Sequence, residues 1–449
     1  ILKYVRIEYG GYVFTANKEI NGLTMGAVGS GTVIDYVQCS FINDDSFEWF
    51  GGKVNCSHLI AYKGKDDAFD TDFGYIGNVQ FALSLRDPQL FDPTYAAASG
   101  ASTSEGFESD NDANSSTLTP KTKAIFSNVT IIGPYRGSLT NAVGAGGTGA
   151  GFKRAARIRR NSELKIFNSI LMDFGTGLHI DGVTTEANAT NGLLKFKNNI
   201  LSGYFSSKGQ VGEVNSGSTF DIKTFIKNNN NDTVPLTAGI LINPYALDDN
   251  NSDFRPGTLA SSGASFTDPA FSGLVLSSYI NKVEYRGAFA PAPSPMWTSG
   301  WTEYNPQTKA YGTANVNVDG ITVGTVVGSD VHITTNTTFT SNNIYLLKGA
   351  VYVDSLVTLT IEPGTVIRGD NIVANSSLII RRGAKLLAEG TPCNPIVFTS
   401  NKVAGSRLPG DWGGIILLGR GSVNQTGGVS NIEGLTIANQ TQFGGGSTP

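Results

Sequence analysis

Acidic side chains recur in two matching segments that lie 22 residues apart. The segments are Asn43–Gly51 and Lys65–Gly74, and their acids are Asp44, Asp45, Glu48, Asp66, Asp67, Asp70 and Asp72. If the segments are successive coils of a stack, these like charges lie roughly 5 Å apart. Such a contact is unfavourable unless another group compensates the charge.

The acids allow three interpretations, of which the first two would also compensate the repulsion. Lys63, Lys65 or Arg86 could pair with the acids, which is the structural interpretation and the favoured one. Ca²⁺ could be bound by carboxylate oxygens, which are the ligands it prefers. Paired carboxylates could also act as acid and base on a glycosidic bond. The predicted metal ligands are Asp44, Asp45, Asp66, Asp67 and Asp70.

A basic cluster and one histidine offer further chemistry. The cluster consists of Lys153, Arg154, Arg157, Arg159 and Arg160, and it could bind an acidic glycan. Pairing with acids on adjacent coils is the favoured alternative. His179 lies between Asp173 and Asp181 in the sequence, but a partly buried structural histidine is favoured over a catalytic pair. We assemble no Ser/His/Asp or Cys/His set, so we predict no catalytic residue and no organic cofactor.

Composition limits the elements that can position these groups. The 449 residues include 55 glycines and only 16% charged residues, which is typical of β structure with many turns. The net charge of −4 argues against a nucleic-acid partner, because phosphate binding requires a basic face. We find no apolar run long enough for a transmembrane helix.

Repeated segments predict a solenoid of parallel β coils. Lys165–Leu171 matches Lys195–Leu201 at an offset of 30, which places Asn168 over Asn198 in an expected asparagine ladder. Leu359–Ile367 matches Leu378–Leu386 at an offset of 19, which places Glu362 opposite Arg381. The predicted fold class is therefore all-β, a parallel β-helix with long loop insertions.

The insertions are expected at 92–122, 136–151 and 204–275, and the last contains a helix candidate at Phe220–Ile226. Cys39 and Cys56 are 17 residues apart and fall out of the 22-residue register. We therefore expect thiols rather than a disulfide.

Several segments resemble a family of secreted or surface-anchored right-handed β-helix proteins of Bacteroidetes, most of unknown function. The matching segments are Leu2–Gly11, Asp44–Gly52, Asp66–Gly74, Val79–Asp87, Tyr285–Phe289, Trp297–Trp301, Leu359–Gly364 and Pro409–Gly414. The resemblance implies a right-handed helix and an extracellular or cell-surface location. It also implies that Trp297 and Trp301 lie in a cap near the end of the helix.

The order of these segments is cyclically permuted relative to the family. We expect 1–312 to form the main body with the cap, and 313–449 to resemble the family's N-terminal coils within the same solenoid. A slice of a tandem array, a true permutation, or two fragments joined in the reverse of their natural order would each produce this sequence.

Two classes of function remain open, together with a third that shares their evidence. The favoured hypothesis is a non-enzymatic structural protein that self-associates, or binds other surface proteins, in a filament or layer. The alternative is a lyase or hydrolase acting on an acidic polysaccharide, which rests on fold analogy. A glycan-binding adhesin is the third.

Overall fold

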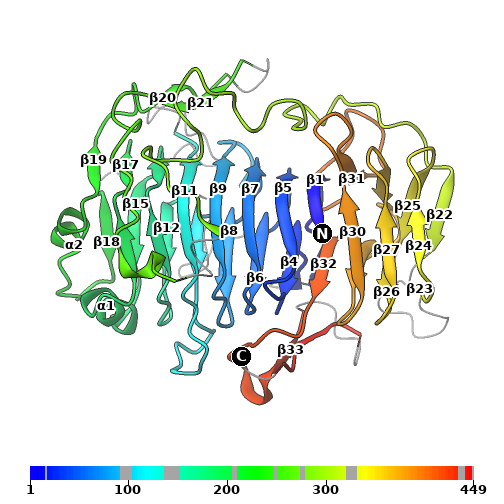
Figure 1. Cartoon of the computed structure of the whole chain (residues 1–449), viewed down its shortest axis with the longest axis horizontal. Coiled ribbons are helices and arrows are strands. Elements are labelled where there is room, and N and C mark those ends of the chain that lie inside the picture. Colours follow the sequence, from blue (N-terminus) through cyan, green and yellow to red (C-terminus); the bar gives the residue numbers. More distant parts are fainter. Residues whose placement is uncertain are drawn as a thin grey trace. The chain divides into compact units, whose positions relative to one another are not determined.

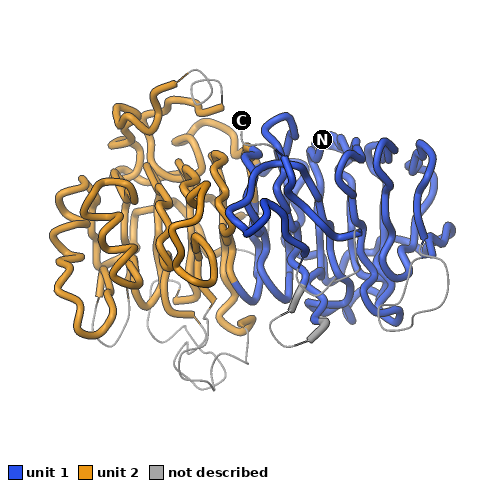
Figure 2. The backbone as a smooth tube through the Cα atoms, turned by 90° about the horizontal axis from the view of Figure 1, so that it is seen from below, with its two compact units in different colours: residues 1–54, 60–66, 298–449 blue, residues 55–59, 67–297 orange. Residues whose placement is uncertain are grey.

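The structure is a computed structural model with two compact units, which Figure 2 distinguishes by colour. Unit 1 comprises residues 1–54, 60–66 and 298–449, and unit 2 comprises residues 55–59 and 67–297. The structure describes residues 1–15, 18–91, 104–135, 152–204, 210–246, 251–273, 279–319, 331–432 and 440–446.

Unit 1 contains two parallel sheets, which we call sheet 1 and sheet 2 (Figure 1). Sheet 1 has strands β22 (Val316–Asp319), β24 (Thr337–Phe339), β25 (Ile344–Lys348), β27 (Thr358–Ile361), β28 (Val366–Gly369), β30 (Lys385–Glu389), β31 (Ile396–Ser400), β1 (Leu2–Glu8) and β5 (Val33–Ser40). Sheet 2 has β23 (Val331–Ile333), β26 (Ala350–Val353), β29 (Ser377–Ile380), β32 (Gly414–Leu418), β4 (Leu23–Gly26) and β6 (Phe47–Phe50). Strand β1 pairs with β31 on one side and β5 on the other.

Unit 2 repeats this arrangement. Its part of sheet 1 has β9 (Asn78–Leu85), β11 (Ile125–Ile132), β13 (Lys165–Phe167), β14 (Ile170–Met172), β16 (Lys195–Lys197), β17 (Ile200–Ser202) and β19 (Asp232–Val234). Its part of sheet 2 has β8 (Phe69–Asp72), β10 (Phe107–Ser109), β12 (Arg154–Ile158), β15 (Thr176–Ile180) and β18 (Gly212–Val214). Strand β7 (Asn55–Tyr62) is divided between the units. The predicted all-β parallel β-helix is thus confirmed in each unit.

Several shorter elements lie outside the two parallel sheets. Three antiparallel pairs are β2 (Val13–Thr15) with β3 (Lys18–Glu19), β20 (Leu241–Asn243) with β21 (Asp253–Pro256), and β33 (Val429–Asn431) with β34 (Gln442–Gly444). The helices are α1 (Val183–Thr190) and α2 (Ile222–Asn228), with short 3₁₀ turns at Pro269–Phe271 and Thr426–Gly428. Helix α2 confirms the candidate at Phe220–Ile226, whereas α1 was not predicted.

The long strands of sheet 1 bend at residues in the left-handed backbone region. In unit 1 the bends of β1 and β5 lie at Tyr4 (φ 49°) and Tyr36 (φ 55°), whose rings stack with centroids 4.4 Å apart. In unit 2, His58 (φ 51°) and Phe81 (φ 60°) stack in the same way, 5.4 Å apart. A non-glycine residue in this region costs about 1–2 kcal/mol. Stacking of the side chains from adjacent coils offsets part of this cost.

A strap, residues 279–312, lies along the outer side of these bends. In unit 2 the Gln80 amide donates to the Asn281 carbonyl (2.8 Å) and accepts from the Asn281 N–H (2.8 Å). In unit 1, Gln38 makes the same pair of bonds with Glu303 (2.8 and 3.0 Å). The repeated use of a glutamine amide shows how the stacked coils present one ladder of donors and acceptors to an extended chain.

The strap corrects the expected placement of two tryptophans. Trp301 packs edge-on against Tyr4 and Tyr36, and Trp297 packs against His58 and stacks on Phe289. Both indoles therefore cover the side of a bend rather than closing a last coil. Bulky rings raised on a left-handed bend leave apolar faces that only another large ring covers well.

The 30-residue register is confirmed, but the ladder falls one residue later than expected. Lys165 pairs with Lys195 and Ile170 with Ile200. The bridging amide is Asn199, whose Oδ1 accepts from the Ser169 N–H (2.9 Å) and whose Nδ2 donates to the Ile166 carbonyl (3.1 Å). Asn168 and Asn198 instead occupy the left-handed bends, which asparagine tolerates well.

The 19-residue register is wrong. Leu359 pairs with Leu386, an offset of 27, and Leu378 pairs with Val351 and Ile415 in the other sheet. Glu362 therefore does not face Arg381, which pairs with Asp354 (2.6 Å). The two similar segments are two sides of the coils, since both have the same apolar strand followed by a glycine turn.

The expected loop at 92–122 is wrong in part. Residues 107–109 form β10, a buried strand of sheet 2 paired with β8 and β12. Residues 92–103 and the whole of the expected loop at 136–151 lie outside the described residues. The three cysteines are described as thiols, as expected, with Cys39 and Cys56 buried and Cys393 exposed.

The Asn199 amide provides the first prediction. Asn199→Ala removes the partners of two buried backbone groups, each of which costs about 1–3 kcal/mol when unsatisfied. We expect the free energy of unfolding to fall by about 3 kcal/mol in urea titrations. The control is Asn228→Ala on the exposed side of α2, which should change stability by no more than about 0.5 kcal/mol. Equal effects of the two variants would contradict the ladder.

Candidate functional site

Charged side chains form a continuous row across sheet 2 of unit 2. In-register pairs join Asp70 on β8 to Glu108 on β10, Arg157 on β12, His179 on β15 and Glu213 on β18. Their strand neighbours are buried and apolar, for example Phe107, Ala156 and Leu178. Because strand side chains alternate between faces, the charged row lies on the outer face of the sheet.

Arginines in and beside the charged row hold the neighbouring acids. Arg159 contacts Glu108 and binds Asp110 (2.7 Å), and Arg157 binds Asp181 (2.7 Å). In the same way, Arg154 bridges Glu105 (3.0 Å) and Glu213 (2.8 Å), and Arg160 binds Asp110 (2.6 Å). The expected pairing of the basic cluster with acids on adjacent coils is confirmed for all four arginines.

The acid end of the row forms a compact triad. Asp67, Asp70 and Glu108 each offer a carboxylate oxygen, and these oxygens lie within 4.8 Å of one another. Burial raises the pKa of Asp70 well above its ordinary value, and the charges of Glu108 and Asp110 raise it further. Burial likewise raises the pKa of Glu108 to about 7, even though Arg159 opposes the shift. The triad therefore resists holding three negative charges alone.

Unit 1 contains a second triad, formed by Asp44, Asp45 and Asp66, with oxygens within 4.8 Å of one another. Contacts next to this triad show the predicted 22-residue offset between the two segments. The Lys65 ammonium donates to Asn43 Oδ1 (2.7 Å), and the Lys65 N–H donates to the Ile42 carbonyl (2.9 Å). The five predicted metal ligands are thus distributed over two triads.

Sequence reasoning missed Glu108, because it lies in a segment predicted to be a surface loop. A signal was nevertheless present. Phe107-Glu-Ser-Asp110 matches Phe69-Asp-Thr-Asp72 at an offset of 38 residues, the offset at which β8 and β10 pair. An aromatic residue followed by acids at alternate positions marks the outer face of a strand.

His179 is a structural member of the charged row. Its Nε2 lies 2.9 Å from Asn215 Oδ1, and the Asn215 amide donates to Asp181 (2.7 Å). Burial and the Arg154 charge lower the pKa of His179 to about 4, with Glu213 and Asp181 opposing the shift. His179 is therefore neutral at physiological pH, and Asp173 lies elsewhere, bonded to Tyr245.

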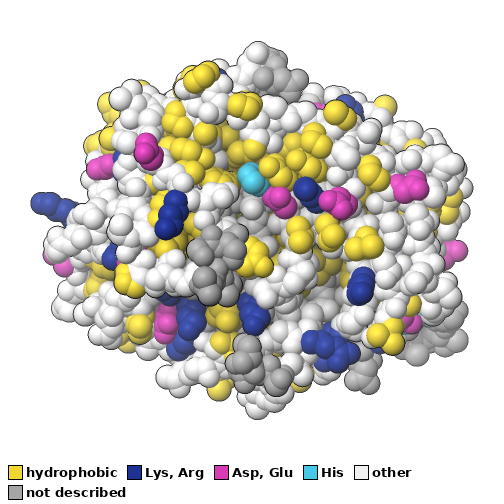
Figure 3. Space-filling view, in the orientation of Figure 1, with side chains coloured by type: hydrophobic (Ala, Val, Ile, Leu, Met, Phe, Trp, Pro, Cys, Tyr) yellow, Lys and Arg dark blue, Asp and Glu magenta, His cyan; other side chains and the backbone are white. Residues whose placement is uncertain are grey.

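The chemistry available to the row follows from these partners. The carboxylates raise the pKa of Arg154 and Arg159 above the ordinary arginine value, so neither guanidinium is suited to act as a base. Carboxylate oxygens with raised pKa values are suited to a hard divalent cation, which would remove the mutual repulsion. On the face drawn in Figure 3, the described acidic and basic side chains are interspersed rather than gathered in a patch of one sign.

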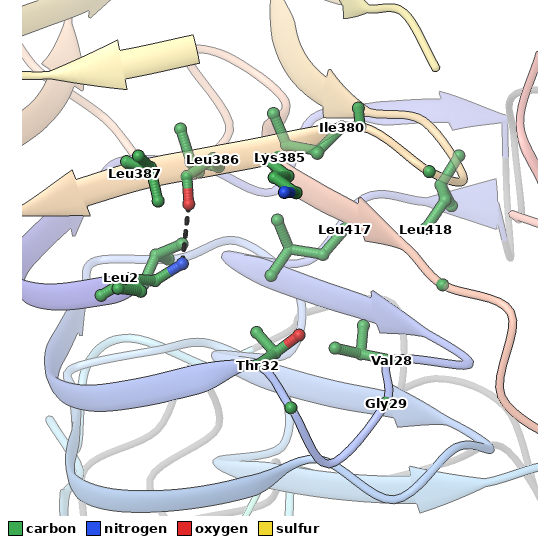
Figure 4. A pocket seen from close by; sticks show the side chains of 15 residues that line it. Leu2, Val28, Gly29, Thr32, Ile380, Lys385, Leu386, Leu387, Leu417 and Leu418 are labelled. Atoms are coloured by element: carbon green, nitrogen blue, oxygen red, sulfur yellow. Dashed lines mark hydrogen bonds between the residues drawn. The ribbon is translucent and has the colours of Figure 1, made fainter. Parts of the chain in front are cut away.

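A cavity of about 330 Å³ in unit 1 has none of these acids in its lining (Figure 4). Its lining includes Leu2, Leu386, Leu417 and Leu418, and the N-terminal ammonium donates to the Leu386 carbonyl (2.7 Å). Lys385 is its single titratable side chain. The lining is thus mostly apolar, and its titratable groups are the Lys385 side chain and the N-terminal ammonium.

Comparison with known proteins supports the architecture. A family model described as a pectate-lyase-like β-helix domain matches residues 1–240 and 331–448. Neither the curated proteins nor the solved structures gave a match. Among the described residues, no helix is long and apolar enough to cross a membrane.

Two arginines that share Asp110 provide a matched pair of variants. Arg159→Met leaves buried Glu108 and Asp110 without their shared partner, so we expect the free energy of unfolding to fall by about 3–5 kcal/mol. Among the described residues, the Arg160 side chain forms an ion pair with Asp110 alone and is 40% exposed, so Arg160→Met should cost about 1 kcal/mol or less. Chemical denaturation of both variants measures the difference, and comparable losses would contradict a buried ladder.

His179 predicts a specific acid sensitivity. Its folded pKa of about 4 lies below the ordinary value of 6.5, so the unfolded chain binds the extra proton as the pH falls. Stability from this group is complete above pH 6.5 and decreases by up to about 3 kcal/mol toward pH 4. His179→Gln should flatten the profile in this window when unfolding is followed from pH 7 to 4. An unchanged slope would show that the imidazole is not buried in its neutral form.

Proposed function

Because the chain belongs to the pectate-lyase-like β-helix family, we propose that it is an extracellular or cell-surface β-helix with a structural role, stabilised by Ca²⁺ at its acid triads. The observation that carries this proposal is the approach of three carboxylates within 4.8 Å in each triad. Stacked coils bring these acids together at fixed spacing. A divalent cation with oxygen ligands would offset the repulsion among these carboxylates.

The ligands would be Asp67, Asp70 and Glu108 in unit 2 and Asp44, Asp45 and Asp66 in unit 1. The raised pKa values of Asp70 and Glu108 support the unit 2 site, because a bound cation would favour their ionised forms. Backbone groups already hold part of this site, since Asp67 accepts from the Glu105 N–H. A fixed carboxylate of this kind reduces the entropy lost on binding a cation.

The charged row favours a structural role over catalysis. Glu108 is only 3% exposed and lies against Arg157 and Arg159, so it has little room to reach a substrate. The paired arginines hold their protons firmly, which argues against the base that a lyase needs. Networks of this kind fix the register of neighbouring strands.

Calcium should stabilise the protein measurably. At a concentration 100 times its dissociation constant, a ligand specific for the folded state adds about 2.7 kcal/mol. We expect CaCl₂ to raise the melting temperature of protein pretreated with EGTA, and calorimetry to give two binding sites. Magnesium at the same concentration is the control, because its strict octahedral geometry fits these clusters poorly. Identical melting curves with Ca²⁺ and EGTA would contradict the proposal.

Asp70→Asn sharpens this experiment. The variant removes one charge from the triad, so without calcium it should be more stable than the parent protein at pH 7. It should also lose one of the two calcium sites, whereas Asp44→Asn should lose the other. A variant with both substitutions should gain nothing from calcium. If Asp70→Asn retains both sites, the unit 2 ligands are assigned wrongly.

A second candidate function is a lyase or hydrolase that acts on an acidic polysaccharide. The observation that favours it is the pKa of about 7 at Glu108, which suits a general acid, beside a second carboxyl group on Asp70. Incubation with pectate, alginate and related polymers, with reducing ends and unsaturated products as readouts, tests it. Release of products that Glu108→Gln abolishes would replace the structural proposal.

A further inference from the structure

Three arginines surround a small polar cavity in unit 1, which differs from the acid triads in the sign of its charged groups. The cavity measures about 180 Å³ and is lined by Ser355, Arg381, Arg382, Arg420, Gln440 and Gln442. Because a water molecule occupies about 30 Å³ of liquid, the cavity has room for a polyatomic ion. Every lining group is charged or polar, which distinguishes this cavity from the apolar one in Figure 4.

The fold assembles this cavity from turns that follow the strands of sheet 2. Val353, Ile380 and Leu417 pair in register at the ends of β26, β29 and β32. Ser355, Arg382 and Arg420 follow these positions by two or three residues, so successive coils deliver them to one side of the stack. The β33–β34 hairpin adds Gln442.

Gly383, which follows Arg382 in the sequence, lies close to two of the lining groups. Gly383 has a φ of +86°, and a Cβ there would lie 2.6 Å from Ser355 Oγ and 3.6 Å from an Arg420 nitrogen. Only glycine adopts this backbone conformation without strain. The hydroxyl and the guanidinium therefore converge on a position that a side chain would otherwise fill.

The guanidinium groups have little nearby negative charge. Arg382 donates to two neutral acceptors, the Gly444 carbonyl (3.0 Å) and Gln442 Oε1 (2.6 Å). Arg381 pairs with Asp354 (2.6 Å), and the Arg420 side chain has no hydrogen bond or ion pair to the described residues. Burial together with the charges of Arg420 and Arg381 lowers the pKa of Arg382. Among the described residues, three guanidiniums and one carboxylate leave about two positive charges around the cavity.

We propose that this arginine cavity binds a doubly charged tetrahedral oxyanion, a sulfate or phosphate group. Arginine forks bind such groups through paired, charge-assisted hydrogen bonds. The Ser355 hydroxyl adds a donor, and the fixed hydrogen bonds of Arg382 orient its guanidinium before binding. Two positive charges match a dianion better than a single carboxylate. The group could be a free sulfate or phosphate ion, or a phosphate monoester on a glycan, which also carries close to two negative charges at neutral pH.

Titration calorimetry with sodium sulfate tests the site against sodium chloride at equal ionic strength. We expect saturable binding of one sulfate per chain. Arg420→Gln should weaken sulfate binding at least about tenfold, because it removes one positive charge from the cavity. The variant should still fold, because Arg420 is exposed and no described residue depends on its side chain for a hydrogen bond. Lys385→Gln is the matched control, since this nearby cation is exposed and lies outside the cavity; it should bind like the parent protein. No saturable binding, or equal binding by Arg420→Gln, overturns the proposal.

A second arm distinguishes the source of the group. Glucose 6-phosphate and glucose are titrated in parallel with inorganic phosphate, and a glycan ester is indicated if the phosphorylated sugar binds more tightly than the free ion. Tighter binding of the free ion indicates an inorganic ligand instead. Melting temperatures of each variant confirm that it is folded. The cavity contains no residue of the acid triads. A negative result for sulfate binding would therefore leave the calcium proposal unaffected, and a negative result for calcium would leave the oxyanion proposal unaffected.

Discussion

The structure depends on the hydrogen-bonded register between successive parallel coils. Each coil satisfies its backbone groups only through the coils on either side, so a residue cannot shift without breaking bonds along a whole strand. The left-handed bends reinforce this register, because Tyr4 lies on Tyr36 and His58 lies on Phe81 through ring contacts. Side chains at equivalent positions are therefore forced together whatever their charge. In a stack of this kind, the side chains at each set of equivalent positions must interact favourably with one another.

A column is a set of side chains at equivalent positions in successive coils. Apolar columns are stabilised by burial in the core, and polar columns are stabilised in three different ways. Buried asparagines bridge coils with both ends of the amide, as Asn199 does for Ser169 and Ile166. Charged columns alternate in sign where the chain supplies arginines, as at Glu108 and Arg157. In the acid triads carboxylates meet carboxylates, and burial together with the charges of Glu108 and Asp110 raises the pKa of Asp70. This difference explains why a cation is proposed at the triads and not along the arginine part of the row.

Much of this organisation could be predicted from the sequence, because stacking repeats the same residue types at equivalent positions. The 22- and 30-residue offsets identified true coil neighbours, and the Asp44-to-Asp70 acids were found from them. The 19-residue offset failed because different sides of a coil share one apolar pattern, so similarity did not imply contact. Glu108 was missed because a polar segment hid the short strand β10. Convergence of Arg381, Arg382 and Arg420 could not be foreseen, since it depends on turn lengths and on a hairpin that the strand pattern does not specify.

The same constraint produces both kinds of proposed ion site, the two cation sites and the anion site. Strand positions on sheet 2 of unit 2 bring carboxylates together, because their spacing is fixed by the pairing of β8 with β10. Turn positions in unit 1 bring guanidiniums together, but turns can vary in length, and Gly383 adapts one of them to make room. Rigid strands are suited to a spherical cation that needs several oxygens at similar distances. Adaptable turns are suited to a polyatomic anion with several acceptors. The unit 2 cation site therefore depends on strand positions at Asp70 and Glu108, whereas the acids of the unit 1 triad lie in turns, as the three arginines do.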